Sequence, residues 1–183
     1  MLILTSPILL VTALAIKLYD GGPVFYLSER IGRDGIPYTL WKFRSMVVDA
    51  DTKVHKLIRQ QGGNALLFKM KDDPRLTPIG RFIRTYSIDE LPQFINSLNG
   101  TMSIVGPRPQ VQREVDEYDA DMHLRLTIRP GITGLWQVSG RSRLSANEAK
   151  RLDLYYVHNW SMLLDMKTIA RTVGAVVTHT GAY

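Results

Sequence analysis

The sequence contains no cysteine, and this absence excludes a disulfide framework, a zinc–thiolate site and a cysteine nucleophile. It also contains no internal repeat at a solenoid period and no low-complexity tract, so it is neither a repeat array nor a disordered linker. With 183 residues, 45% of them hydrophobic and 22% charged, the chain is long enough for one globular domain with its own core. The missing cysteines fit a reducing compartment.

A hydrophobic run long enough to cross a bilayer is also missing, although the N-terminus comes near to one. Residues 1–16 carry no charged side chain, whereas a spanning helix needs roughly 20 apolar residues. Pro7 interrupts the run, because proline lacks a backbone N–H and kinks a helix. These features favour a re-entrant helix that enters the membrane and bends there. A signal peptide, a buried core helix and a truncated spanning helix remain as alternatives.

Acidic residues are outnumbered, since 17 Asp and Glu against 23 Lys and Arg give a formal net charge of +6. A basic chain favours anionic partners, namely nucleic acid, anionic lipid or phosphorylated small molecules. The sequence shows neither a helix-turn-helix pattern nor a stacked-aromatic pattern, so we expect no nucleic-acid partner.

A β-hairpin is predicted after the apolar segment. Residues 24–27 and 36–43 are β-prone, and the Arg-Asp-Gly sequence at 33–35 supplies turn chemistry between them. Lys42 lies near the end of the second strand and, taken alone, is typical of a solvated strand end. Residues 47–61 then show the apolar spacing of a helix.

Two helices are predicted to meet at a pair of adjacent carboxylates. The first opens at Thr77 with a proline at its first helical position, and it carries Arg84 near its end. The second is expected to bury an apolar stripe formed by Leu91, Phe94, Ile95 and Leu98. Asp89 and Glu90 lie at the joint between the two helices.

Two interpretations of this joint compete. Ser87 and Glu90 match a capping box, but Pro92 would then remove a backbone N–H that the helix needs. If Asp89 is the N-cap instead, Pro92 falls where no intrahelical bond is made, and the carboxylate is only partly committed to capping. The field of the helix start, together with Arg84, would then hold Asp89 ionised. Plain capping and a chemical role both remain open at this point.

Further candidates lie in the second half of the chain. Arg108 stands between two prolines, which restrict where it points and suit it to phosphate or carboxylate capture. Residues 129–141 form a Gly-rich stretch ending at Arg141, with the backbone donors of an anion-binding loop. Structural turns are the alternative for both.

Two more helices are expected: residues 145–157, which open with a capping box, and residues 161–177. The last is predicted to bury Leu163, Met166, Ile169, Ala170 and Val173, and Trp160 is assigned either to the core or to a membrane surface.

Taken together, these blocks closely resemble the catalytic domain of the bacterial polyprenyl-phosphate sugar-phosphate transferases, the monotopic phosphoglycosyl transferases. The matching blocks are residues 21–46, 73–109, 129–141 and 152–169. Members of this family usually begin with a basic segment and a fuller membrane helix. We therefore expect a truncated membrane-associated helix at residues 1–20 and a cytosolic catalytic domain at residues 21–183.

The resemblance implies a reaction and roles for individual residues. A sugar 1-phosphate moves from a UDP-sugar to polyprenyl (undecaprenyl) phosphate, with release of UMP. Asp89 is implied as the nucleophile, through a phosphosugar–aspartyl intermediate, and also as a ligand of Mg²⁺. Glu90 is implied to assist it. The residues implied to hold phosphates are Arg84, Arg108, Arg141 and, as a weaker candidate, Lys42.

The expected fold is α/β and mostly helical, with a small sheet, an N-terminal membrane-inserted helix and amphipathic surface helices. The resemblance places such an enzyme on the cytoplasmic face of the bacterial inner membrane, where it initiates exopolysaccharide, capsule or O-antigen synthesis. Membrane lipids are expected partners, and a homodimer is plausible from larger relatives. Two alternatives remain: a non-catalytic basic membrane- or nucleic-acid-binding module, and a metal-dependent phosphatase using the same Asp-Glu pair. The sequence does not specify the sugar.

Overall fold

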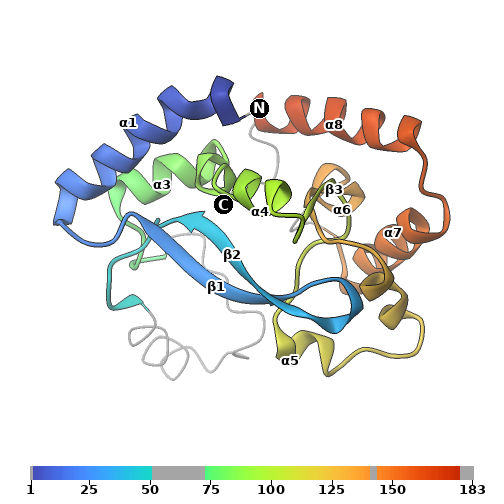
Figure 1. Cartoon of the computed structure of the whole chain (residues 1–183). Coiled ribbons are helices and arrows are strands. Elements are labelled where there is room, and N and C mark those ends of the chain that lie inside the picture. Colours follow the sequence, from blue (N-terminus) through green and yellow to red (C-terminus); the bar gives the residue numbers. More distant parts are fainter. Residues whose placement is uncertain (1, 51–72, 141–143, 178–183) are drawn as a thin grey trace.

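The computed structural model describes residues 2–50, 73–140 and 144–177. The helices in these ranges are α1 (Leu2–Asp20), α3 (Pro78–Thr85), α4 (Gln93–Leu98), α5 (Gln112–Val115), α6 (Leu135–Val138), α7 (Ala146–His158) and α8 (Met162–Val177). Short 3-10 helices are η1 (Arg33–Gly35), η3 (Ile88–Glu90) and η4 (Met122–Thr127), and the strands are β1 (Phe25–Ile31), β2 (Pro37–Phe43), β3 (Ser103–Val105) and β4 (Gly131–Thr133). The mostly helical α/β class is confirmed. In Figure 1, α1, α3, α4 and α8 lie above the hairpin of β1 and β2.

The predicted hairpin is confirmed. Strands β1 and β2 pair antiparallel, with Tyr26 opposite Lys42 and Arg30 opposite Tyr38. Asp34 in the turn has φ 59°, a left-handed conformation that aspartate tolerates better than most residues. Because strand side chains alternate between faces, Tyr26, Ser28 and Arg30 share one face of the hairpin.

The glycines of the 129–141 stretch serve close packing. Gly131 belongs to β4, which pairs parallel with β3, and its N–H donates to the carbonyl of Pro107. A Cβ on Gly131 would lie 2.1 Å from the nitrogen of Gly106, and one on Gly134 would lie 2.1 Å from the Gly106 oxygen. Both glycines are buried, so this part of the stretch is not the exposed anion-binding loop that we expected. Only backbone without side chains can approach so closely.

Helix α1 packs onto the rest of the chain through one face. Ile16 is buried with Phe43 of β2 and Ile83 of α3. The helix runs from Leu2 to Asp20 with Pro7 inside it, so it is not broken at this residue, and the kink expected there stays a prediction. Among the described residues, no helix combines the length and the apolar character needed to cross a membrane.

Helix α4 turns its polar face inward, contrary to the predicted apolar stripe. Leu98 is 78% exposed, whereas Asn96 is fully buried. The Asn96 amide donates to the carbonyl of Thr39 at 2.7 Å and accepts from the Trp41 N–H at 3.0 Å. This side chain therefore satisfies backbone groups along the outer edge of β2, which an apolar residue could not do.

Helix α8 is also inverted relative to the prediction. All five side chains assigned to the core are exposed, namely Leu163, Met166, Ile169, Ala170 and Val173. The inward face carries Thr168 and Thr172, whose hydroxyls are satisfied by carbonyls one turn earlier. Thr172 also shares a hydrogen bond with Thr133 of β4 at 2.8 Å. Trp160 is 60% exposed, so its assignment to the core is wrong.

The predicted helix starts are confirmed where capping chemistry was strong. Thr77 Oγ1 accepts from the Gly80 N–H at 2.8 Å, and Ser145 and Glu148 form a reciprocal capping box. Most of the helix predicted at 47–61 falls outside the described residues.

Candidate active site

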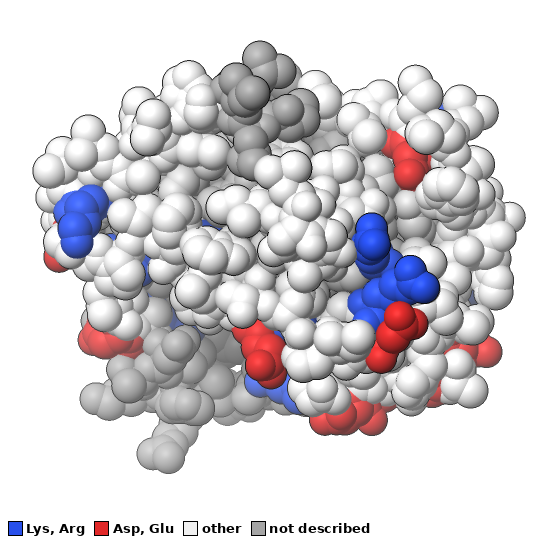
Figure 2. All heavy atoms as spheres, viewed as in Figure 1, with Lys and Arg blue, Asp and Glu red and all other residues white. Residues whose placement is uncertain are grey.

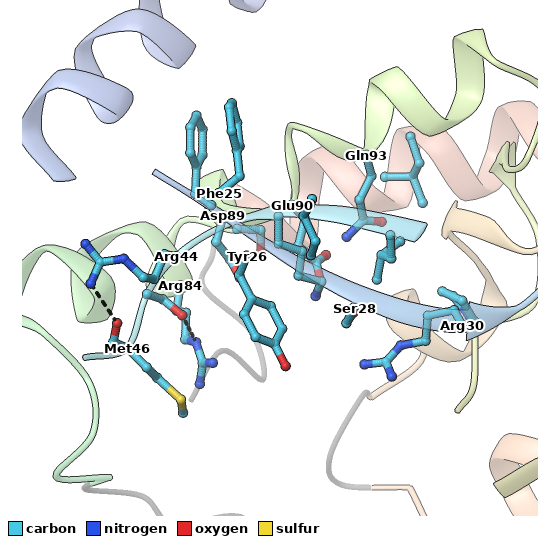
Figure 3. Close-up of a pocket in the computed structure, with 18 of the residues that line it drawn as sticks. Phe25, Tyr26, Ser28, Arg30, Arg44, Met46, Arg84, Asp89, Glu90 and Gln93 are labelled. Carbon is cyan, nitrogen blue, oxygen red and sulfur yellow. Dashed lines mark hydrogen bonds and ion pairs between the residues drawn. The ribbon is translucent and has the colours of Figure 1, made fainter. Parts of the chain in front are cut away.

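A cavity of about 800 Å³ lies against the face of the hairpin that carries Tyr26, Ser28 and Arg30. Its walls also include η3, the segment around Arg108, and Trp136 of α6. In the close-up of Figure 3, Arg84 lies at one end of the drawn residues and Arg30 at the other, with Asp89 and Glu90 between them.

Asp89 reaches this cavity from η3, between α3 and α4. The turn is set by Ser87, which has φ 55°, and Ile88 packs beside the cluster around Ile83. Asp89 is the middle residue of the turn, and the N-cap position of α4 is taken by Pro92. The expectation that Asp89 caps the second helix is therefore wrong, and the Ser87 capping box is absent as well. The Asp89 carboxylate therefore caps neither helix, and it lies on the cavity wall.

Burial controls the proton affinity of Asp89. The residue is only 8% exposed, and its burial, followed by the nearby charge of Glu90, raises its pKa from 3.8 to about 6. The charges of Lys42 and Arg84 act in the opposite direction. The expected stabilisation of the anion by a helix start is thus outweighed by desolvation, although Asp89 is still mostly ionised at pH 7.

Glu90 and Lys42 form an ion pair on the cavity wall. Lys42 Nζ lies 2.8 Å from Glu90 Oε1, across 48 residues of sequence. The strand end that looked solvated therefore contributes Lys42 to the site. Because both side chains keep part of their surface exposed, a substrate in the cavity could contact either.

The cationic side chains of the cavity fall into two groups. Three have a carboxylate partner among the described residues: Lys42 with Glu90, Arg44 with Asp20, and Arg75 with Asp73. The other three, Arg30, Arg84 and Arg108, have no carboxylate partner within the described ranges. A cavity lined by guanidinium groups that lack counter-ions is suited to binding an anion.

Arg84 and Arg108 are each held in position by other parts of the chain. Arg84 Nε donates to Ser45 Oγ at 2.8 Å. The Arg108 guanidinium lies over the ring of Trp136, 5.2 Å from its centroid. The carbonyl of Arg108 accepts from Arg125 Nη2 at 3.0 Å.

Arg125 is in turn buried and paired with Asp153 of α7 at 2.7 Å. The pair with Asp153 holds the Arg125 guanidinium in place, and Arg125 in turn binds the backbone of Arg108 between the two prolines. Arg141, the remaining predicted phosphate ligand, lies outside the described residues.

Sequence reasoning missed four residues of this arrangement: Arg30, Ser45, Arg125 and Asp153. Arg30 could have been found, because strand alternation places it on the same face of the hairpin as Tyr26, whose partner across the hairpin is Lys42. The other three act through contacts distant in sequence, which no local pattern signals.

The chain as a whole also matches a known protein family. A family model described as bacterial sugar transferase matches residues 1–179. The chain belongs to the bacterial sugar transferase family. The resemblance drawn from the sequence is thereby confirmed.

Relatives of this family carry names that describe sugar transfer. The galactosyl transferase CpsE of Streptococcus agalactiae is 46% identical over 164 residues, which cover 89% of this chain and 36% of the relative. The undecaprenyl-phosphate galactose phosphotransferase of Salmonella typhimurium is 40% identical, over 100% of this chain and 39% of the relative. The exopolysaccharide production protein ExoY of Rhizobium meliloti is 39% identical, over 100% of this chain and 82% of the relative. The chain thus spans less than two fifths of the first two relatives.

The carboxylates of the cavity fit a Mg²⁺ ion that is shared with substrate. Among the described residues no group of three or more potential metal ligands occurs, so a site made entirely of protein ligands is not formed there. Mg²⁺, however, commonly binds through one or two carboxylates and completes its shell with water and phosphate oxygens. Asp89, which is buried and touches no side-chain cation in the described part of the chain, and its neighbour Glu90 match that donor set.

Proposed function

We propose that this chain transfers a sugar 1-phosphate from a UDP-sugar to polyprenyl phosphate and releases UMP. The observation that carries the proposal is the Asp89 carboxylate, buried on the wall of a cavity that also holds Arg30, Arg84 and Arg108. Family membership supports it, since relatives are named as galactose and glucose phosphate transferases acting on undecaprenyl phosphate. The corresponding biological process would be the start of exopolysaccharide, capsule or O-antigen synthesis, and a relative named exopolysaccharide production protein ExoY supports the first of these.

In the first step, an Asp89 oxygen attacks the phosphorus that carries the sugar. A bond forms between the carboxylate and phosphorus, the bond from phosphorus to the bridging oxygen breaks, and its electron pair leaves with UMP. Arg84 is placed to neutralise charge beside Asp89, because its charge already lowers the pKa of that carboxyl. Burial makes the same carboxylate poorly solvated and therefore more reactive toward phosphorus.

In the second step, a phosphate oxygen of the lipid attacks the phosphorus held by Asp89. The new bond joins the two phosphates, and the carboxylate leaves in its original form. Glu90 and Lys42 lie beside this centre and can orient the incoming phosphate. Mg²⁺, held by Asp89 and Glu90 with substrate oxygens, would neutralise the charge of the phosphates.

The lipid acceptor requires contact with a membrane, and the exposed apolar faces supply a surface for it. The exposed apolar side chains include Ile8, Leu10, Val11, Leu14 and Leu18 on α1, Ile95 and Leu98 on α4, and Met162, Leu163, Met166, Ile169 and Val173 on α8. These helices share the upper side of Figure 1, and Figure 2 shows few charged side chains there. We propose that this surface, with α1 inserted, rests on the cytoplasmic leaflet, so that lipid phosphate and Asp89 meet.

Isotope exchange tests the reaction without lipid. Labelled UMP is incubated with UDP-galactose or UDP-glucose, Mg²⁺ and detergent-solubilised protein, and label in the UDP-sugar is measured. A covalent intermediate predicts exchange that Asp89→Asn abolishes while Asp121→Asn, on the surface, retains it. Release of free sugar phosphate without lipid would instead identify a phosphatase. A binding module would give neither exchange nor UMP, and either result refutes the proposal.

A further inference from the structure

Arg30 lines the cavity without a carboxylate partner among the described residues, and the two steps proposed above give it no role. It comes from β1, two residues after Ser28, and both side chains face the cavity. In Figure 3 Arg30 projects from the strand at the opposite end from Arg84. Among the described residues its side chain makes one long hydrogen bond, 3.4 Å from Nη1 to the carbonyl of Glu29, so the guanidinium retains most of its hydrogen-bonding capacity.

Arg30 and Arg108 line the same cavity, and their like charges repel one another. Burial lowers the pKa of Arg30, and the charge of Arg108 lowers it further, while Glu114 acts in the opposite direction to a smaller extent. Two like charges in a partly buried place are unfavourable unless an anion joins them. Arg125 and Trp136 nevertheless hold Arg108 in this place.

A buried hydroxyl lies next to this pair. Ser28 Oγ is inaccessible to bulk water and, among the described residues, has no hydrogen-bond partner. Unsatisfied buried polar atoms are uncommon in folded proteins, so each requires an explanation. Ser28 lines the cavity, so a rotation about its Cα–Cβ bond would turn the hydroxyl toward a ligand oxygen there, which would accept its hydrogen bond.

We propose that Arg30, Arg108 and the Ser28 hydroxyl form a second anion subsite, which binds the phosphate of the departing nucleotide. The inference rests on the proposed function, because it assigns a product group to this end of the cavity. Arg84 and Asp89 would hold the sugar-linked phosphate, and the second subsite would hold the neighbouring one. Ser28 and Arg30 thereby become binding residues of the donor.

The subsite stabilises the leaving phosphate when the bond between phosphorus and the bridging oxygen breaks. When the carboxylate–phosphorus bond forms, the electron pair of the bridging bond stays on the UMP oxygen, and the charge of that phosphate grows by one. Two guanidiniums already in place stabilise this growing charge without rearranging during the reaction. The same contacts should make UMP bind more tightly than uridine.

Trp136 offers a direct probe, since it stacks on Arg108. The sequence has three tryptophans, so Trp41→Phe and Trp160→Phe leave Trp136 as the sole indole fluorophore. This protein is titrated with inorganic phosphate, UMP and uridine in detergent. Phosphate and UMP should change the fluorescence, and Arg30→Gln should weaken both by at least about tenfold, as expected for a charge-assisted hydrogen bond. Ser28→Ala should weaken them about threefold.

Arg33→Gln is the matched control, because Arg33 is more than half exposed, is paired with Asp34 and does not line the cavity. Unchanged phosphate affinity in both Arg30→Gln and Ser28→Ala, with circular dichroism showing folded proteins, overturns the subsite. Equal weakening by Arg33→Gln overturns it too. In the exchange assay, Arg30→Gln should raise the UMP concentration for half-maximal exchange about tenfold. Phosphate binding that depends on Arg30, in a protein without any exchange, would support the anion subsite and refute the proposed reaction.

Discussion

Replacement of Asp89 by asparagine should stabilise the metal-free protein while it abolishes transfer. The physical reason is the burial of the carboxylate, which raises its pKa from 3.8 to about 6. A folded state that disfavours the charged form loses stability as the pH rises past the unfolded pKa, and the loss is complete above the folded one. Asparagine has nearly the same shape and never carries this charge.

The size of the effect follows from the two pKa values. A difference of about 2 pKa units corresponds to about 3 kcal/mol, since one unit is about 1.36 kcal/mol. The Asn variant should therefore unfold with a free energy about 3 kcal/mol higher at pH 7.5. At pH 5, where Asp89 is largely protonated in the fold but ionised when unfolded, the gain should fall to roughly half of this value.

Denaturant unfolding in detergent with a chelator measures both values. Asp121→Asn, which neutralises an exposed aspartate, should change stability by less than about 0.5 kcal/mol at either pH. Added Mg²⁺ should stabilise the wild-type protein and narrow the gap, because the ion favours the ionised carboxylate. Two results would contradict this reasoning: an Asp89→Asn protein no more stable than wild type at pH 7.5, or one stabilised equally at both pH values. Either would show that burial does not raise the pKa of Asp89.

Three further changes test other parts of the structure. Gly80→Ala would bring a Cβ to 1.7 Å from the Ser45 carbonyl oxygen, so thermal unfolding should show a loss of about 3 kcal/mol or more. Asp153→Ala leaves the buried Arg125 without its partner and should cost about 3–5 kcal/mol by denaturant unfolding. Leu98→Glu, at a side chain 78% exposed, should leave stability within about 0.5 kcal/mol but reduce sedimentation with anionic vesicles severalfold.

Each of these has an outcome that contradicts it. A Gly80→Ala protein of wild-type stability would mean that α3 can move away from Ser45 without cost. If Asp153→Ala lost no more stability than Asp121→Asn, the buried pair of Arg125 and Asp153 would not be what holds Arg108 in place. Unchanged vesicle binding by Leu98→Glu would exclude α4 from the membrane surface.

The elements predicted well were those specified by local chemistry. The hairpin followed from β-prone runs around a turn that suits Asp34 and Gly35, and the helix starts at Thr77 and Ser145 followed from side chains that accept from nearby N–H groups. These signals need only neighbouring residues. The adjacent carboxylates at 89 and 90 were likewise visible, and they do lie on the cavity wall.

The orientation of helices was predicted poorly. Periodicity shows that a helix such as α4 or α8 has an apolar face, but not which side of it meets the protein. Asn96 and Thr168 occupy the buried sides because their polar groups have partners there, either in β2 or in the helix itself. Those partners are known only once the chain has folded.

The sequence by itself determined the family, the hairpin, the capped helix starts and the presence of Asp89 beside Glu90, because motifs and caps depend on residues close together in the chain. Only the tertiary structure decided the pKa of Asp89 and which charged side chains share the cavity with it. Its raised pKa reflects burial beneath distant elements, and Arg30 and Arg108, which line the same cavity, are 78 positions apart in the sequence. Desolvation and charge act through space, so their balance is set by packing.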